Sequence, residues 1–276
     1  MPQLGRGGQN SADTIAMNER TTMRYARLDR IRGLALVWMA IFHFCFDLSH
    51  YGLINANFYV DSFWTTQRTF ILSLFLLCAG AGQAVATAQG QTWARFWKRW
   101  AQVAGCALAV TAGSMLMFPD SFIYFGVLHG MAVMLLLTRV VAHFGWLKGR
   151  WLWPVGAVAV ALPLLIQHPF FDTRWTNWVG LITHKPITED YVPLLPWIGV
   201  MLWGLAATQW VLANRPQWLV GRPGNNPEGR GMVAHLAPAA CLSLLGRWSL
   251  TFYMAHQPIL IGGLSVWMLW QGRPLP

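Results

Sequence analysis

Long apolar segments alternate with short polar ones along most of the chain. Seven apolar segments each span about 20 residues, the length that an α-helix needs to cross the hydrocarbon core of a bilayer. They cover residues 31–50, 66–87, 101–118, 123–144, 152–168, 193–213 and 244–269. This pattern predicts an all-α, polytopic transmembrane bundle of about seven spans. We assign residues 23–270 to one transmembrane domain, and we find no internal repeat.

Two polar stretches interrupt this pattern. Residues 1–22 are polar and contain Gly, Asn and Thr, and they predict a disordered cytoplasmic tail. The connector 214–241 contains the run GRPGNNPEGRG, which is typical of a flexible loop.

The composition agrees with a membrane protein. Of the 276 residues, 55% are hydrophobic and 11% are charged, whereas soluble domains carry about 25% charged residues. The formal net charge is +10. Because the basic residues lie between apolar spans, we interpret them as topology signals and lipid headgroup contacts, not as a nucleic-acid-binding surface.

The distribution of basic residues predicts the orientation. One side of the predicted membrane carries only Arg174, Lys185 and Arg273, with Arg68 near a span end. The other side carries Arg20, Arg24, Arg27, Arg30, Arg32, Arg95, Lys98, Arg99, Arg139, Lys148, Arg150, Arg215, Arg222, Arg230 and Arg247. The positive-inside rule therefore predicts a cytoplasmic N-terminus in a multi-pass protein of the inner (plasma) membrane.

The first span carries ionisable residues on one face. Arg32 and His43 are eleven residues apart, about three helical turns or roughly 16 Å along the axis, so they share a face. Asp47 follows one turn later on the face of His43. Ionisable groups inside a membrane are costly and indicate a functional site. A carboxylate at this spacing can orient an imidazole and stabilise its charged form.

Other polar side chains are predicted at similar depth on different helices. They are Arg68, His129 and His256. Each has a structural interpretation, because a single histidine can join two helices and an arginine can extend to the interface. Five ionisable groups at matching depth exceed what packing needs, so we predict a buried site. His50 lies near the expected outer opening of that site.

The four cysteines predict no metal site. Cys45, Cys78, Cys106 and Cys241 lie in or beside apolar runs and lack the spacing of metal ligands. We interpret them as small packing residues.

Several segments together resemble a known family. They are RLDRIRGLALVWMAIFHFCFDLSHYG (27–52), RTFILSLFLLCAG (68–80), FIYFGVLHGMAV (122–133), DYVPLLPWIGV (190–200) and LGRWSLTFYMAHQPIL (245–260). The chain resembles membrane acyltransferases of the heparan-α-glucosaminide N-acetyltransferase catalytic-domain type, especially small prokaryotic members. The Arg-x10-His spacing and the last segment are also similar to membrane acyltransferases of type 3.

The resemblance implies acyl transfer from a cytosolic acyl-CoA, expected to be acetyl-CoA, to a hydroxyl or amine on the outer side. The acceptor in such families is often a sugar. In the type 3 group the histidine of Arg-x10-His is regarded as catalytic, and His43 occupies that position here. The eukaryotic branch relies on a histidine nearer the lumen, which leaves His50 as the alternative base.

This chemistry gives each candidate residue a role. Histidine is the usual base near neutral pH, so His43 would take the acceptor proton while Asp47 orients it. Arg68, His129 or His256 would meet the negative charge that develops on the thioester oxygen. The phosphates of the donor would bind Arg27, Arg30, Arg32, Arg95, Lys98 and Arg99. The sequence allows direct transfer or a transient acyl-histidine.

Two other classes remain open from the sequence. A transporter or flippase could use intramembrane His and Asp as a proton relay, although no inverted repeat supports it. A b-type haem protein could use His43 and His256 as axial ligands.

Overall fold

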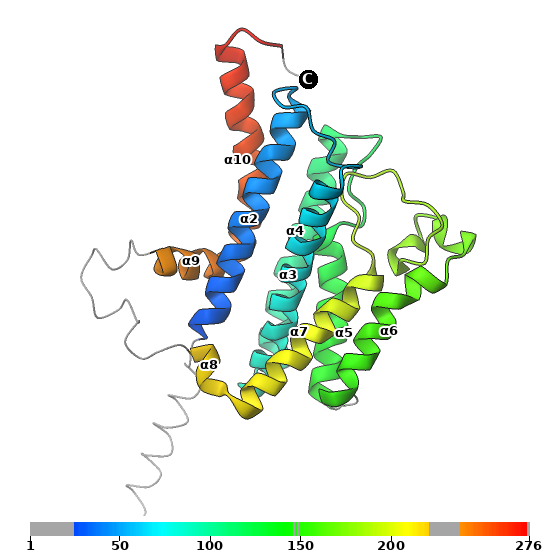
Figure 1. Cartoon of the computed structure of the whole chain (residues 1–276), viewed down its shortest axis with the longest axis vertical. Coiled ribbons are helices and arrows are strands. Elements are labelled where there is room, and N and C mark those ends of the chain that lie inside the picture. Colours follow the sequence, from blue (N-terminus) through cyan, green and yellow to red (C-terminus); the bar gives the residue numbers. More distant parts are fainter. Residues whose placement is uncertain (1–24, 146, 148, 221–237, 275–276) are drawn as a thin grey trace, which may run out of the picture.

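The computed structural model describes residues 25–145, 147, 149–220 and 238–274, which form a bundle of helices (Figure 1). The predicted tail 1–22 and most of the connector 214–241 lie outside the described residues. The same holds for five of the predicted topology signals: Arg20, Arg24, Lys148, Arg222 and Arg230.

The described residues contain helices and no strand. The long helices are α2 (Ala26–His50), α3 (Ser62–Ala88), α4 (Trp93–Met117), α5 (Val127–Phe144), α6 (Gly149–Leu165), α7 (Leu194–Asn214) and α10 (Ser249–Trp270). The short ones are η1 (Pro169–Asp172), η2 (Asn177–Val179), α8 (Pro216–Val220) and α9 (Pro238–Arg247). A single bridge joins Phe125 and Tyr191. The prediction of an all-α fold is thus confirmed over these ranges.

Seven long helices overlap the seven predicted segments, although α4 begins at Trp93, eight residues before the predicted start at 101. They are not equally suited to a membrane. Within the described ranges, five are long and apolar enough to cross it: α2, α3, α4, α5 and α7. Helix α6 is apolar but has 17 residues. Helix α10 carries the polar pair His256 and Gln257. The seven-span count and the cytoplasmic N-terminus therefore stay predictions.

One predicted boundary is wrong in an informative way. The predicted span 244–269 starts too early, because α9 ends at Arg247 and the chain turns at Trp248 before α10. Helix α9 instead lies across α2 (Figure 1). A Cβ at Gly246 would overlap the Asp29 carbonyl, and one at Gly33 would overlap the Leu242 carbonyl. Glycines on both helices thus allow the backbones of α9 and α2 to touch. Helix α9 packs across α2 in this way and does not continue straight into α10.

A second pair of glycines joins α3 and α7. A Cβ at Gly80 would overlap the Met201 carbonyl oxygen, and one at Gly204 would meet the Leu77 carbonyl oxygen. Small residues at such crossings let membrane helices approach closely and gain van der Waals contact. Around this crossing a buried apolar core joins α3, α5, α6 and α7.

Helix α10 lies beside α2 although the two are at opposite ends of the chain (Figure 1). The Tyr51 hydroxyl lies 2.6 Å from the Ser265 hydroxyl, which joins the ends of the two helices. Lower down, Leu245 and Phe252 pack against the buried α2 cluster that contains Leu36 and Met39. This packing places the polar face of α2 against the polar residues of α10.

Candidate active site

Two of the predicted histidines meet between α2 and α10. His43 Nδ1 lies 2.7 Å from His256 Nε2, and the two rings are stacked with centroids 5.0 Å apart. His256 is buried and His43 is half-buried. The predicted convergence of these two helices is therefore present in the structure. A direct hydrogen bond between the two ring nitrogens leaves no room for a metal between them, so this geometry does not fit a haem ligated by both.

The surroundings of His256 assign its protons. Its Nδ1 lies 2.7 Å from the Tyr253 carbonyl oxygen, which can only accept a hydrogen bond. In the neutral ring Nδ1 therefore carries the hydrogen and Nε2 is an acceptor. His43 Nδ1 must then donate to it, which leaves the lone pair of His43 on Nε2. Among the described residues, this nitrogen has no hydrogen-bond partner.

The sequence around His256 favours this arrangement. Pro258 has no N–H and cannot donate to the carbonyl four residues earlier, which loosens the backbone hydrogen bonding of α10 at this point. The Phe252 ring stacks on His256 with centroids 5.7 Å apart and fixes its plane. The ring of His256 is thus positioned by its own helix before it meets His43.

Asp47 lies one turn above His43 and is 3% exposed. Its Oδ1 accepts a hydrogen bond of 2.7 Å from Gln257 Nε2, so its hydrogen-bond partner is Gln257 and not His43. Asp47 Oδ2 and Gln257 Oε1 are buried and have no partner among the described residues. Two buried acceptors without donors, adjacent to the histidine pair, could receive hydrogen bonds from the N–H or O–H groups of a substrate.

His129 lies in a different environment, in the first turn of α5. Its Nε2 is 3.0 Å from the Thr111 hydroxyl, and its Nδ1 accepts a hydrogen bond of 3.3 Å from the Gly126 N–H. These bonds join α4 and the start of α5. The structure therefore gives His129 local partners and does not bring it to His43.

Arg68 is exposed on α3. It interacts electrostatically with Lys185 and Asp190, both in the segment before α7. Of the five predicted groups, the structure thus shows His43 bonded to His256 and Asp47 bonded to Gln257, whereas His129 and Arg68 have other partners.

The segment before α7 also holds a carboxylate, Asp190, that was not among the predicted site residues. Asp190 Oδ2 accepts a hydrogen bond of 2.6 Å from the Val127 N–H and so caps the first turn of α5. The Asp190 carboxylate also interacts electrostatically with the Tyr253 hydroxyl on α10. The motif DYVP at 190–193 is the sequence feature that could have indicated Asp190 as a site residue. Burial raises the pKa of the Asp190 carboxyl, although the Val127 N–H and the positive charges of Arg68 and Lys185 oppose this.

The raised pKa of Asp190 makes a prediction about pH. The folded protein holds this proton more tightly than the unfolded chain, so the group contributes stability below the unfolded pKa of about 4. That contribution is lost as pH rises through the folded pKa. Replacing Asp190 with Asn should therefore reduce the fall in melting temperature between pH 4 and pH 7. Thermal unfolding in detergent measures this, with Asp120→Asn at an exposed position as the control. Equal pH slopes for wild type and Asp190→Asn would refute the assignment.

The predicted donor-binding cations lie on two helices and differ in their surroundings. Arg32 donates to Asp29 Oδ1 and to the Cys78 carbonyl, both at 3.4 Å, and Arg27 lies over the Trp218 ring. Arg30 is half-buried beside them on α2. The exposed cations are on α4: Arg95, Lys98 and Arg99.

Arg139 differs from its expected role as a flanking surface charge. It is 1% exposed, donates to the Thr87 hydroxyl at 3.2 Å and to the Gln91 carbonyl, and lies over the rings of Trp93 and Phe96. It therefore joins α5 to the turn between α3 and α4.

Apolar helices around the pair of His43 and His256 define an integral membrane protein with a polar site between α2 and α10. Residues 24–258 match the family described as heparan-alpha-glucosaminide N-acetyltransferase, catalytic. The chain belongs to this family of membrane acetyltransferases, as the resemblance in its sequence segments predicted. The match includes all five predicted catalytic residues and ends at Pro258. Comparison with curated proteins and with solved structures returned no match.

Proposed function

We propose that this protein transfers an acetyl group from acetyl-CoA to a hydroxyl or amine, in the simplest case of a sugar, on the outer side of the inner membrane. The observation that carries this proposal is the pair formed by His43 and His256, in a chain of an acetyltransferase family. The transporter alternative has no comparable support, because the family match indicates a transferase.

In this proposal His43 Nε2 is the base. The acceptor O–H or N–H gives its proton to Nε2 as the acceptor atom attacks the thioester carbon. The tetrahedral intermediate then collapses, the C–S bond breaks, and the imidazolium returns the proton to the departing CoA sulfur. General base catalysis of this kind typically accelerates a reaction about 10²–10⁴-fold.

His256 supports the charge that forms on His43. When His43 is protonated, its Nδ1–H still donates to His256 Nε2, and the Tyr253 carbonyl dipole stabilises positive charge on the pair. This arrangement favours His43 over His50, which is exposed at the last residue of α2. It also gives a histidine the orienting role that the sequence assigned to Asp47.

The free acceptor atoms of Asp47 and Gln257 are proposed to bind the acceptor molecule next to the base. Arg68 and His129, which lie with the outer-loop residues, are proposed to contact the acceptor as it enters. The donor phosphates are proposed to bind at the opposite helix ends, where the six cations on α2 and α4 lie.

Isotope-labelled acetyl-CoA tests the proposal directly. Purified protein in liposomes should bind the label saturably and transfer it to an amino sugar or another hydroxylated acceptor on the opposite side. Excess unlabelled CoA should compete, and heat-unfolded protein is the background control. If the folded protein shows no saturable binding, or binds the label without ever transferring it, the proposed function is wrong.

A further inference from the structure

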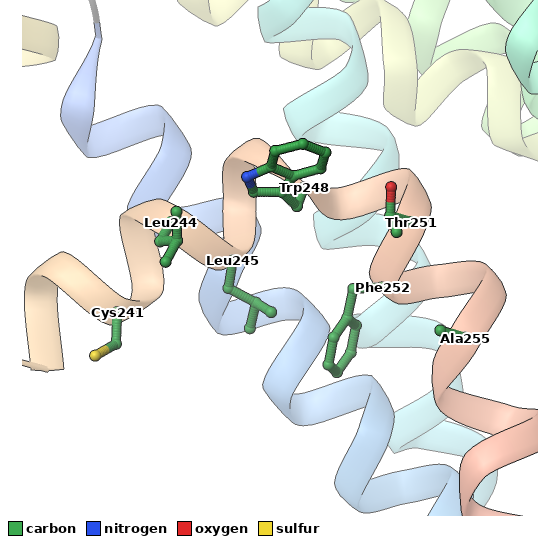
Figure 2. Close-up of a pocket in the computed structure, with 7 residues that line it drawn as sticks. All are labelled: Cys241, Leu244, Leu245, Trp248, Thr251, Phe252 and Ala255. Carbon is green, nitrogen blue, oxygen red and sulfur yellow. The ribbon is translucent and has the colours of Figure 1, made fainter.

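An open apolar groove lies in the inner angle between α9 and α10 (Figure 2). Its volume is about 370 Å³, which falls in the range of small-molecule sites. Leu245 and Phe252 project into this angle, and Leu244, Trp248 and Ala255 line it further. None of these residues was a predicted site residue.

The groove runs from a helix end toward the middle of the bundle. At its shallow end α9 touches α2 at Asp29 and Gly33. At its deep end the Phe252 ring stacks on His256, which pairs with His43. The ten residues from Gly33 to His43 correspond to about 15 Å of helix, roughly half the hydrocarbon thickness of a bilayer. The groove therefore has the depth and direction of a lipid acyl chain in one leaflet.

The shallow end carries an uncompensated cation. Arg247 is exposed and directly precedes Trp248 at the bend. Among the described residues it makes no salt bridge, and the neighbouring acid, Asp29, is paired with Arg32. Cations at this depth attract anionic headgroups, and tryptophan is enriched at the same level.

The groove wall selects the kind of molecule that fits. Apart from the Thr251 hydroxyl and the Trp248 indole N–H, it offers few polar partners. The pantetheine arm of CoA contains amides that would remain without hydrogen bonds here. An alkyl chain needs none, and the nearby Arg247 complements a phosphate at its end.

We infer that this groove binds an anionic phospholipid from the leaflet at the N-terminal end of α2. Its phosphate lies beside Arg247, and one acyl chain lies over Leu245 and reaches Phe252. The lipid thereby covers the ring that fixes the plane of His256. This inference does not depend on acetyl transfer.

Native mass spectrometry of the full-length protein tests the site, with dioleoyl phosphatidylglycerol and dioleoyl phosphatidylcholine as probes. We expect wild type to retain one molecule of the phosphatidylglycerol in preference to the phosphatidylcholine. Arg247→Gln should reduce this retention about fivefold, the effect of one cation near a membrane surface. Ala255→Trp should fill the groove and abolish the retention of either lipid there.

Two matched variants serve as controls. Val266→Trp places the same tryptophan side chain at an exposed position on α10, and Arg150→Gln removes an exposed cation from α6. Both should retain the lipid as wild type does. Equal retention by Arg247→Gln and Arg150→Gln would overturn the inference, as would equal retention of the two lipids by wild type. If Ala255→Trp does not fold, the comparison of lipid retention between Arg247→Gln and Arg150→Gln still tests whether the groove binds an anionic lipid.

Discussion

Replacing His43 with alanine should lower kcat for acetyl transfer by about 10²–10⁴-fold, because the base that takes the acceptor proton is lost. Binding of acetyl-CoA should change little, since His43 is not among the cations proposed to hold the donor. Initial rates with labelled acetyl-CoA, measured beside the binding isotherm, separate the two effects.

His50→Ala and His256→Ala complete this experiment. His50→Ala should keep most of the activity, because His50 is exposed at the end of α2. His256→Ala should lose less than His43→Ala, because the base remains while its partner is removed. Added imidazole should partly restore His43→Ala, which a merely misfolded variant would not show. Full activity in His43→Ala with loss in His50→Ala would transfer the role of base to His50.

The largest effect on stability is expected at the crossing of α3 and α7. Gly80→Val should destabilise the protein by about 3 kcal/mol, because the new side chain would overlap the Met201 carbonyl and force the two helices apart. Thermal unfolding in detergent, followed by the fluorescence of the many tryptophans, measures this change.

Gly105→Val on α4 is the matched control. A Cβ at Gly105 would meet nothing within 4 Å, so the variant should unfold at the wild-type temperature or slightly above it. If Gly80→Val unfolds at the same temperature as Gly105→Val, the close crossing of α3 and α7 is not a source of stability.

The sequence predicted the helices well because the membrane requires long apolar segments. It also predicted that His43 and His256 would lie at one depth, because the rise per residue fixes position along a helix. The sequence does not specify which face of each helix meets a neighbour. That depends on contacts such as Gly80 with the Met201 carbonyl, which become visible only when two distant helices are placed together.

The same limit explains the differences within the candidate site. Arg68 and His129 have suitable depths, but Arg68 is exposed on α3 and His129 bonds to Thr111. The spacing of Asp47 from His43 is right for a contact, yet Gln257 on α10 competes for the carboxylate and holds it. The bend at Trp248 was missed because apolar residues lie on both sides of the short stretch 246–249. The backbone contact of Gly246 leaves little trace in hydropathy.

The pairing of His43 with His256 also has a consequence for biosynthesis. The two histidines are 213 residues apart in the chain, and His256 belongs to the last described helix. The nascent protein cannot assemble this pair until α10 has left the ribosome and packed against α2. A chain that stalls or is cut before that point would carry His43 without its partner. The pair of His43 and His256 would thus form only after α10 has been synthesised.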